Sequence, residues 1–151
     1  GREMRLEWRE GDARVPRLDG DVLLCGGPKE GFARRVELFL KRRALETLSV
    51  ETAHYAAAAG VAARSVAVGD ADSRWGSCSA SGRIRDSWRL ILAPPDARGY
   101  VVAHEVAHLA HLNHGPEFKA LERRLFGDGI AAARALLTRV GPGLKRIGRG
   151  G

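Results

Sequence analysis

The chain has 151 residues, of which 44% are hydrophobic and 28% are charged. This length suits one domain with a buried core, and the composition excludes the disordered and fibrous classes of protein. Its 25 lysines and arginines outnumber its 18 acidic residues, and the resulting formal net charge of +7 is compatible with an acidic partner.

The sequence predicts a protein of a reducing, aqueous compartment. It has no run of roughly eighteen apolar residues, and its opening, GREMRLEWRE, lacks the apolar core of a signal peptide. Cys25 and Cys78 are far apart and form no CxxC pair, so neither a disulfide framework nor a zinc ribbon is indicated. We therefore expect a cytoplasmic protein without membrane association, while the sequence leaves the oligomeric state open.

The first part of the chain is predicted to contain two strands followed by two helices. Residues 4–8 and 21–25 are short β-like runs separated by turn-forming residues. Over residues 31–48, apolar residues recur at helical spacing and basic residues occupy the other faces. A second helix is predicted after Ser49, a favourable N-cap, and its end is predicted at Gly60, which suits the left-handed conformation found there.

Sheet structure is predicted to resume after these helices. Residues 64–70, 83–85 and 88–92 are β-like, and Pro94 and Pro95 close the last run. Strands and helices in this order predict an α+β fold, with a small mixed or antiparallel sheet packed on helices.

Helices are predicted for the rest of the chain. The run GYVVAHEVAHLAHL consists mainly of good helix formers, and Asn, Gly and Pro follow it. Two more helical patterns cover residues 116–125 and 130–140. We expect a single domain over residues 1–140 and a flexible basic tail over residues 141–151.

Four of the five histidines lie in the stretch AHEVAHLAHLNHGPEF, where His104, Glu105 and His108 spell HExxH. On a helix, residues four apart lie about 40° apart on one face, so the two imidazoles can bind one metal ion. Glu105 can reach water in an open metal position. The motif therefore predicts a zinc hydrolase in which Glu105 takes a proton from the attacking water and passes it to the leaving amine.

A catalytic zinc ion needs a third protein ligand, and several residues qualify. His111 would share a helix face with His104 but would lie roughly 10 Å along the helix axis. The NHGP sequence around His114 favours a turn that can bring this side chain back from a new direction. Glu117 and Glu122 are further alternatives. We favour His114 as the third ligand.

The block RWGSCSASGRIRDSWRLILAPPDARGYVVAHEVAHLAHLNHGPEF, residues 74–118, resembles the YgjP-like metallopeptidase domain family. The motifs that carry the resemblance are RWGSC, WRLILAP, HEVAHL and NHGPEF. The resemblance implies a zincin-like fold, a zinc ion held by His104, His108 and His114, Glu105 as the catalytic acid or base, and peptide or protein substrates. It also implies kinship with SprT-like peptidases, which cleave DNA-bound proteins, although the chain shows no zinc ribbon or other DNA-binding module.

The residues around the motif suggest how a substrate is held. In zincin-like folds an edge strand beside the active helix pairs with the substrate, and residues 83–92 are predicted to provide it. Arg74 or Arg89 is predicted to place a substrate carbonyl or carboxylate, and Tyr100 or His111 to stabilise an oxyanion. The plainer interpretation of RWGS is a structural turn with a buried tryptophan.

An alternative hypothesis is a nucleic-acid-associated domain with a structural zinc site. Its basic helix, residues 34–43, would contact phosphates, and the basic surface is compatible with a weak association with nucleic acid. A structural zinc ion normally has four protein ligands, and His111 would then be the fourth. An open fourth position would favour the peptidase, and a closed one the structural site.

Overall fold

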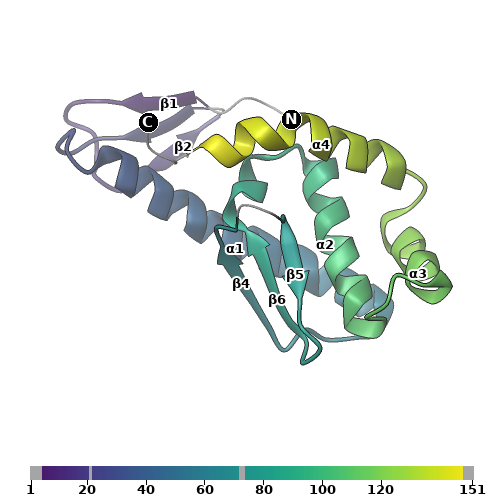
Figure 1. The fold of residues 1–151 in the computed structure, drawn as a ribbon. Coiled ribbons are helices and arrows are strands. Elements are labelled where there is room, and N and C mark those ends of the chain that lie inside the picture. Colours follow the sequence, from purple (N-terminus) through teal and green to yellow (C-terminus); the bar gives the residue numbers. More distant parts are fainter. Residues whose placement is uncertain (1–4, 21, 72–73, 148–151) are drawn as a thin grey trace.

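The computed structural model describes residues 5–20, 22–71 and 74–147, which form an α+β fold (Figure 1). In these residues, four α-helices and one 3-10 helix accompany two three-stranded sheets. The elements are β1 (Arg5–Trp8), β2 (Arg17–Asp19), β3 (Val22–Cys25), α1 (Phe32–Ala59), β4 (Ser65–Gly69), β5 (Gly76–Cys78), β6 (Arg83–Ser87), the 3-10 helix η1 (Trp88–Leu92), α2 (Pro95–Ala110), α3 (Pro116–Phe126) and α4 (Ile130–Arg146). None of the helices in the described part of the chain is long and apolar enough to cross a membrane.

The first sheet has the strand order β1-β3-β2. β1 runs parallel to β3, with Leu6 opposite Leu23, and β2 runs antiparallel to β3. The two strands predicted at this end of the chain are confirmed in β1 and β3, although Met4 and Asp21 lie outside the described residues. β2 was not predicted, because its three residues lie within a segment rich in turn-forming residues.

Helix α1 is a single helix of 28 residues, so the predicted break at Ser49 is wrong. Its start after Gly31 and its end at Gly60, where φ is 72°, agree with the predicted limits. One buried stripe continues through the expected break, and its members are Val36, Leu40, Ala44, Leu48, Thr52 and Ala56. Burial of this stripe outweighs the small helix preference lost at a serine.

The second sheet has the order β4-β6-β5, with β4 parallel and β5 antiparallel to β6. β6 is therefore the central strand, which corrects the prediction that residues 83–92 provide a free edge. Trp88–Leu92 is also not a strand. The Ser87 hydroxyl accepts a hydrogen bond from the Arg89 backbone N–H (3.3 Å), which starts a 3-10 turn. The two edge strands are β4, which contacts α1, and β5, which contacts α2.

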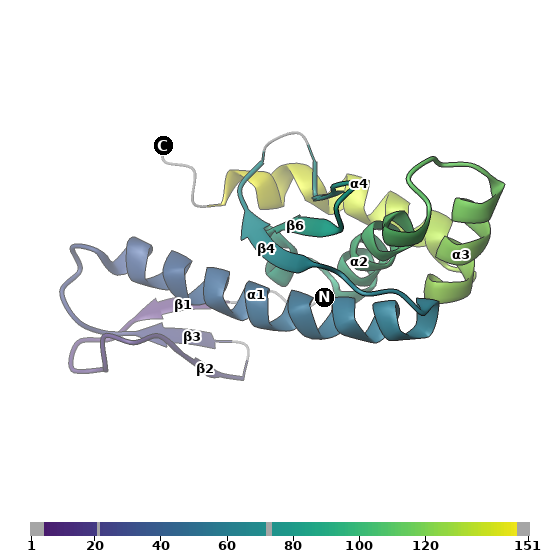
Figure 2. The ribbon, with the colours of Figure 1, turned by 90° about the horizontal axis from the view of Figure 1, so that it is seen from below.

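Helix α2 lies at the centre of the helical layer and contacts α1, α3, α4 and β5. Figures 1 and 2 show the first sheet beside the N-terminal half of α1 and the second sheet beside its C-terminal half. Val102, Ala103 and Val106 of α2 are almost completely buried. The helix that carries HExxH is thus held on several sides and is a rigid base for a site.

Helix α4 continues to Arg146, whereas the sequence predicted a flexible tail from residue 141. Tertiary contacts explain the difference. A Cβ atom at Gly141 would lie 3.2 Å from the Trp75 ring, so glycine allows a close approach that a larger residue would disturb. Lys145 lies over the same ring, with its ammonium 4.9 Å from the centroid. The rest of the expected tail, residues 148–151, lies outside the described residues.

Arg89 connects the C-terminal end of α4 to the region of the second sheet through hydrogen bonds. Its side chain is 1% exposed, pairs with Asp70, and stacks on Trp88 with 4.5 Å from the guanidinium carbon to the ring centroid. Its Nε and Nη2 donate hydrogen bonds of 2.9 and 2.7 Å to the Ile147 carbonyl, the acceptor at the helix end. A buried guanidinium with these partners is structural, so the prediction that Arg89 places a substrate group is wrong.

We predict that Arg89→Ala lowers the free energy of unfolding by about 3 kcal/mol, because the stacking is lost and the Ile147 carbonyl loses two donors. Urea denaturation followed by circular dichroism measures the change. Arg42→Ala, which removes an exposed arginine of α1, is the control and should change stability by less than about 0.5 kcal/mol. Equal effects of the two variants would show that Arg89 does not have this role.

Candidate metal centre

Helix α2 places His104 and His108 one turn apart on the same face. The helix begins with Pro95 at a position where its missing N–H is not needed, and Asp96 follows in the first turn. The two imidazole rings meet edge to face, with 4.9 Å between their centroids. The helix ends at Ala110 because His111 adopts an extended conformation, with φ −138° and ψ 109°.

The chain then reverses and brings His114 back to the helix. Pro116 starts α3, and Gly115 before it is extended, as expected for a residue that precedes proline. His114 Nε2 lies 2.8 Å from His108 Nε2, and the His114 ring centroid is 5.2 Å from that of His104. The structure therefore brings together the three histidines that the sequence singled out.

Hydrogen bonds orient two of the rings. His104 Nδ1 lies 2.6 Å from Glu122 Oε2, and His108 Nδ1 lies 3.2 Å from the His111 carbonyl oxygen, to which it donates. Because each Nδ1 is engaged, Nε2 of both rings is left as the nitrogen for a metal. Glu122, which the sequence offered as a third ligand, instead lies behind His104.

Phe118 supports all three imidazoles. It is 2% exposed, and its ring centroid lies 5.0, 4.5 and 4.7 Å from those of His104, His108 and His114. Its position in the first turn of α3, two residues after Pro116, makes this contact a direct result of the chain reversal. Sequence reasoning did not predict this contact.

The three histidines fit a zinc ion. One ligand atom from each of His104, His108 and His114 lies within 4.8 Å of the others, and nitrogens on a tetrahedral zinc ion lie roughly 3.3 Å apart. Burial lowers the pKa of His108, and the neighbouring His104 lowers it further, which favours the neutral imidazole that binds metal. Neutral imidazoles suit zinc better than the oxygen-preferring magnesium or calcium ions.

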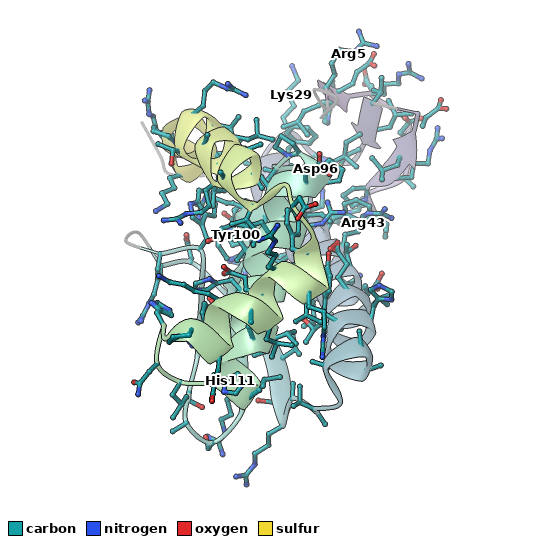
Figure 3. All side chains as sticks on the ribbon, turned by 90° about the vertical axis from the view of Figure 1, so that its right-hand side faces the viewer. Arg5, Lys29, Arg43, Asp96, Tyr100 and His111 are labelled. Atoms are coloured by element: carbon teal, nitrogen blue, oxygen red, sulfur yellow. The ribbon has the colours of Figure 1, made fainter. Side chains whose placement is uncertain are left out.

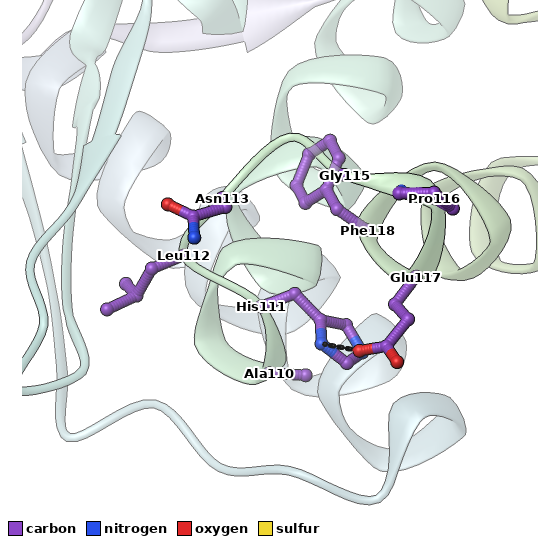
Figure 4. Close-up of a pocket in the computed structure, with 8 residues that line it drawn as sticks. All are labelled: Ala110, His111, Leu112, Asn113, Gly115, Pro116, Glu117 and Phe118. Carbon is purple, nitrogen blue, oxygen red and sulfur yellow. Dashed lines mark ion pairs between the residues drawn. The ribbon is translucent and has the colours of Figure 1, made fainter.

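His111 does not join the cluster. Its Nδ1 is 3.5 Å from Glu117 Oε2, and Figure 4 shows this pair at the wall of a hollow formed by the chain reversal. The hollow has a volume of about 540 Å³ and also contacts Leu112 and Phe118. Tyr100 lies in the first half of α2 and His111 directly after its end, and Figure 3 shows the two residues well apart. The His111 ring therefore does not serve as a fourth ligand in this arrangement.

Glu105 lies on the side of α2 that faces β5, and it is 5% exposed. A Cβ atom at Gly76 would lie 3.0 Å from Glu105 Oε2 and 2.8 Å from Asp86 Oδ1, so glycine leaves room for two carboxyl groups. Burial and, to a smaller extent, the nearby Asp86 raise the pKa of Glu105 to about 7, while the positive charge of Arg74 opposes this rise. Burial also raises the pKa of the neighbouring Cys78 thiol, which therefore stays protonated.

Asp86 is a second buried acid beside Glu105. It is 1% exposed, and neither carboxyl oxygen has a hydrogen-bond partner among the described residues. Burial raises the pKa of Asp86 to about 7, with a contribution from Glu51. Sequence reasoning missed this residue. The sequence pattern that could have indicated its burial is the alternation in β6, where Ile84 and Asp86 face inward between exposed arginines.

Comparison with known proteins gives one match. A family model described as "YgjP-like, metallopeptidase domain" matches residues 1–139. No curated protein and no solved structure matches the chain.

The raised pKa of Asp86 predicts a pH-dependent stability. In the unfolded chain an aspartate has a pKa of about 3.9, so the folded protein binds more protons between that value and about pH 7. The contribution of Asp86 to folding is therefore most favourable below about pH 4 and becomes unfavourable as the pH rises through 7. We predict that Asp86→Asn raises the free energy of unfolding on the order of 3 kcal/mol at pH 8, with little effect near pH 4.

Urea denaturation at both pH values, with a chelator present, measures this difference. Asp128→Asn, which changes an exposed carboxylate paired with Arg123, is the control and should shift stability by less than about 0.5 kcal/mol at either pH. An Asp86→Asn effect that is the same at pH 4 and pH 8 would contradict the proposed protonation.

Proposed function

Because the chain belongs to the YgjP-like metallopeptidase family, we propose that it is a zinc-dependent peptidase that hydrolyses peptide bonds in peptide or protein substrates. The observation that carries the proposal is that ligand nitrogens of His104 and His108 on α2, and of His114 from the turn after α2, lie within 4.8 Å of one another, while α2 also presents Glu105. Three nitrogen ligands leave one position of a tetrahedral ion open, as catalytic zinc sites require.

In this proposal, Nε2 of His104, His108 and His114 would hold the zinc ion. A bound zinc ion supplies Lewis acidity, which polarises the substrate carbonyl and lowers the pKa of water. Glu122 fixes the His104 ring through Nδ1, and the His111 carbonyl does the same for His108. Phe118 keeps water from the back of the three rings.

Glu105 is the proposed general base and acid. Its carboxylate takes a proton from the attacking water, which forms the new bond to the carbonyl carbon, and returns it to the leaving amine. A pKa of about 7 makes both the acceptor and the donor form available near neutral pH. The protein sets this value mainly by burying the side chain, and Arg74 keeps it from rising further.

The substrate backbone is proposed to pair with β5. Bonds of 2.7 Å from Ser87 N–H to the Trp75 carbonyl and of 2.9 Å from Ser79 N–H to the Arg83 carbonyl show which residues face β6. In the antiparallel pattern, Gly76 and Cys78 then direct their N–H and C=O groups to the opposite edge. An extended peptide can pair with these groups beside α2.

Tyr100 is the proposed partner of the developing oxyanion. Its ring lies one helical turn before His104, with 5.8 Å between the ring centroids, and its hydroxyl interacts electrostatically with Glu122 and Glu105. The His111 ring, the other group considered for this role, is held by Glu117. The same contact argues against the alternative of a structural zinc site with His111 as the fourth ligand. Exposed arginines such as Arg34 and Arg42 provide a basic surface on which weak nucleic-acid association can be tested.

The zinc ligands are tested by a graded series of variants. His114→Ala should weaken zinc binding by more than about a hundredfold, whereas His111→Ala should change it by less than about threefold, because only the His111 backbone contacts the site. Glu122→Gln should cost about tenfold to a hundredfold, since the charged partner of His104 is lost. Competition with a chromogenic chelator measures these affinities.

Glu117→Gln is the matched control for Glu122→Gln, because Glu117 is also in α3 but is 83% exposed and contacts only His111 among these groups. Its zinc affinity should equal that of the unchanged protein. Loss of zinc on His111→Ala with retention on His114→Ala would reverse the ligand assignment.

Glu105→Gln tests the mechanism. The variant should bind zinc normally and lose peptide hydrolysis by about a hundredfold to ten-thousandfold, because the amide cannot carry the proton. Turnover of a fluorogenic peptide library, together with metal analysis of the same samples, measures both properties. Undiminished hydrolysis by the zinc-loaded variant would contradict the role of Glu105.

A further inference from the structure

Asp86 is a buried acid that the mechanism described above does not use. It lies in the central strand of the second sheet (Figure 1), where its neighbours across the strands are Val68 of β4 and Gly76 of β5. Aspartate is a poor strand former, and burial of its carboxyl group is costly unless the group is neutral or hydrogen-bonded. A residue that is this unfavourable for folding and lies beside the proposed base calls for a functional explanation.

The surroundings of Asp86 favour its protonated form. Neither of its carboxyl oxygens has a hydrogen-bond partner among the described residues. Burial raises the pKa of Asp86 to about 7, and Glu51 of α1, which contributes to this rise, is an acid itself. A protonated carboxyl group has one O–H donor, and a buried donor requires an acceptor.

Glu105 provides an acceptor at a suitable distance. A Cβ atom at Gly76 would lie 2.8 Å from Asp86 Oδ1 and 3.0 Å from Glu105 Oε2, so the two oxygens are no further apart than these two distances combined. No direct hydrogen bond joins them. One water molecule, with hydrogen bonds of about 2.8 Å to each oxygen, spans a separation of this size.

Gly76 keeps the space between the two acids free of a side chain. It pairs with Asp86 across β5 and β6, and α2, which carries Glu105, contacts β5. Any other residue at this position would place a carbon atom against both carboxyl groups. A glycine opposite an inward-facing aspartate is therefore the local feature that allows the two carboxyl groups to approach the same point.

The proposed mechanism decides which of the two acids carries the proton. A general base has to be ionised before it can accept a proton, so the charge belongs to Glu105 and the proton to Asp86. A hydrogen bond to one oxygen of the Glu105 carboxylate fixes its rotation and leaves the other oxygen for the attacking water. Orientation of this kind matters, because a misplacement of about 1 Å can cost a hundredfold in rate.

We infer that Asp86 is a positioning residue for the base: its protonated carboxyl group holds one oxygen of Glu105 through a bridging water molecule. This inference rests on the proposed peptidase function and deepens it. It gives the central strand of the second sheet a part in catalysis that the HExxH motif does not contain.

Two variants of Asp86 separate positioning from a structural role. Asn and Leu both remove the buried acid and keep the branched shape of the side chain, so both variants should fold. Only the Asn amide can donate a hydrogen bond to the bridging water. We expect Asp86→Leu to lower kcat for a fluorogenic peptide about tenfold with KM and zinc affinity unchanged, and Asp86→Asn to keep kcat within about twofold.

Ile84→Val is the matched control. Ile84 is the other inward-facing residue of β6 and is 2% exposed, but its side chain forms no hydrogen bond. The substitution should lower the melting temperature without changing kcat. Crystal structures of the unchanged protein and of both Asp86 variants provide a readout without turnover. We expect an ordered water between residues 86 and 105 in the unchanged protein and in Asp86→Asn, and a displaced Glu105 carboxylate in Asp86→Leu.

Failure of this inference and failure of the proposed function give different results. Absence of peptide hydrolysis by the unchanged, zinc-loaded protein would overturn the function, and the crystal structures would still test the contact. Equal kcat values for Asp86→Asn and Asp86→Leu would overturn the positioning role, because that result shows no effect of the donor. A Glu105 side chain in the same conformation in all three structures would also overturn it.

Discussion

The packing of Phe118 against three imidazole rings is the contact on which the proposed metal centre depends. A helix presents only two ligands of one ion from adjacent turns, so the third ligand has to come from a segment that has changed direction. Here the change occurs between Ala110 and Pro116, and Phe118 closes it by inserting its buried ring under the histidines. Helix α3 then supplies Glu122 to the same site, so one turn positions both His114, a proposed ligand, and the hydrogen-bond partner of His104.

The site also concentrates buried acidic groups, which are costly for folding. The carboxyl groups of Glu105 and Asp86 both lie against the same face of Gly76, and burial raises the pKa of both to about 7. A carboxyl group without hydrogen-bond partners, such as that of Asp86, is favoured in a protein interior mainly when it is protonated. This part of the fold gives up stability at neutral pH, as catalytic sites commonly do.

The sequence predicted much of the site because the patterns that indicate it involve only residues close together in the chain. The spacing of His104 and His108 and the helix-breaking residues around His114 depend only on neighbours in the chain. The contact of Glu122 with His104 depends on how α3 packs on α2, which no local pattern encodes. The role of Phe118 has the same origin. In the fold, burial overrode local preference at Ser49, and a serine cap turned Trp88–Leu92 into a 3-10 helix although its composition is typical of a strand.

The contact between α4 and Trp75 limits how far the chain can be truncated from its C-terminal end. Residues 141–146 look dispensable by composition, yet Gly141 and Lys145 cover the Trp75 ring, and Arg89 holds the carbonyl of Ile147. Arg74, next to Trp75, belongs to the surroundings of Glu105. A protein shortened at residue 140 would keep the three clustered histidines but would lose the contacts of α4 that cover Trp75. The smallest intact unit therefore extends to the end of α4.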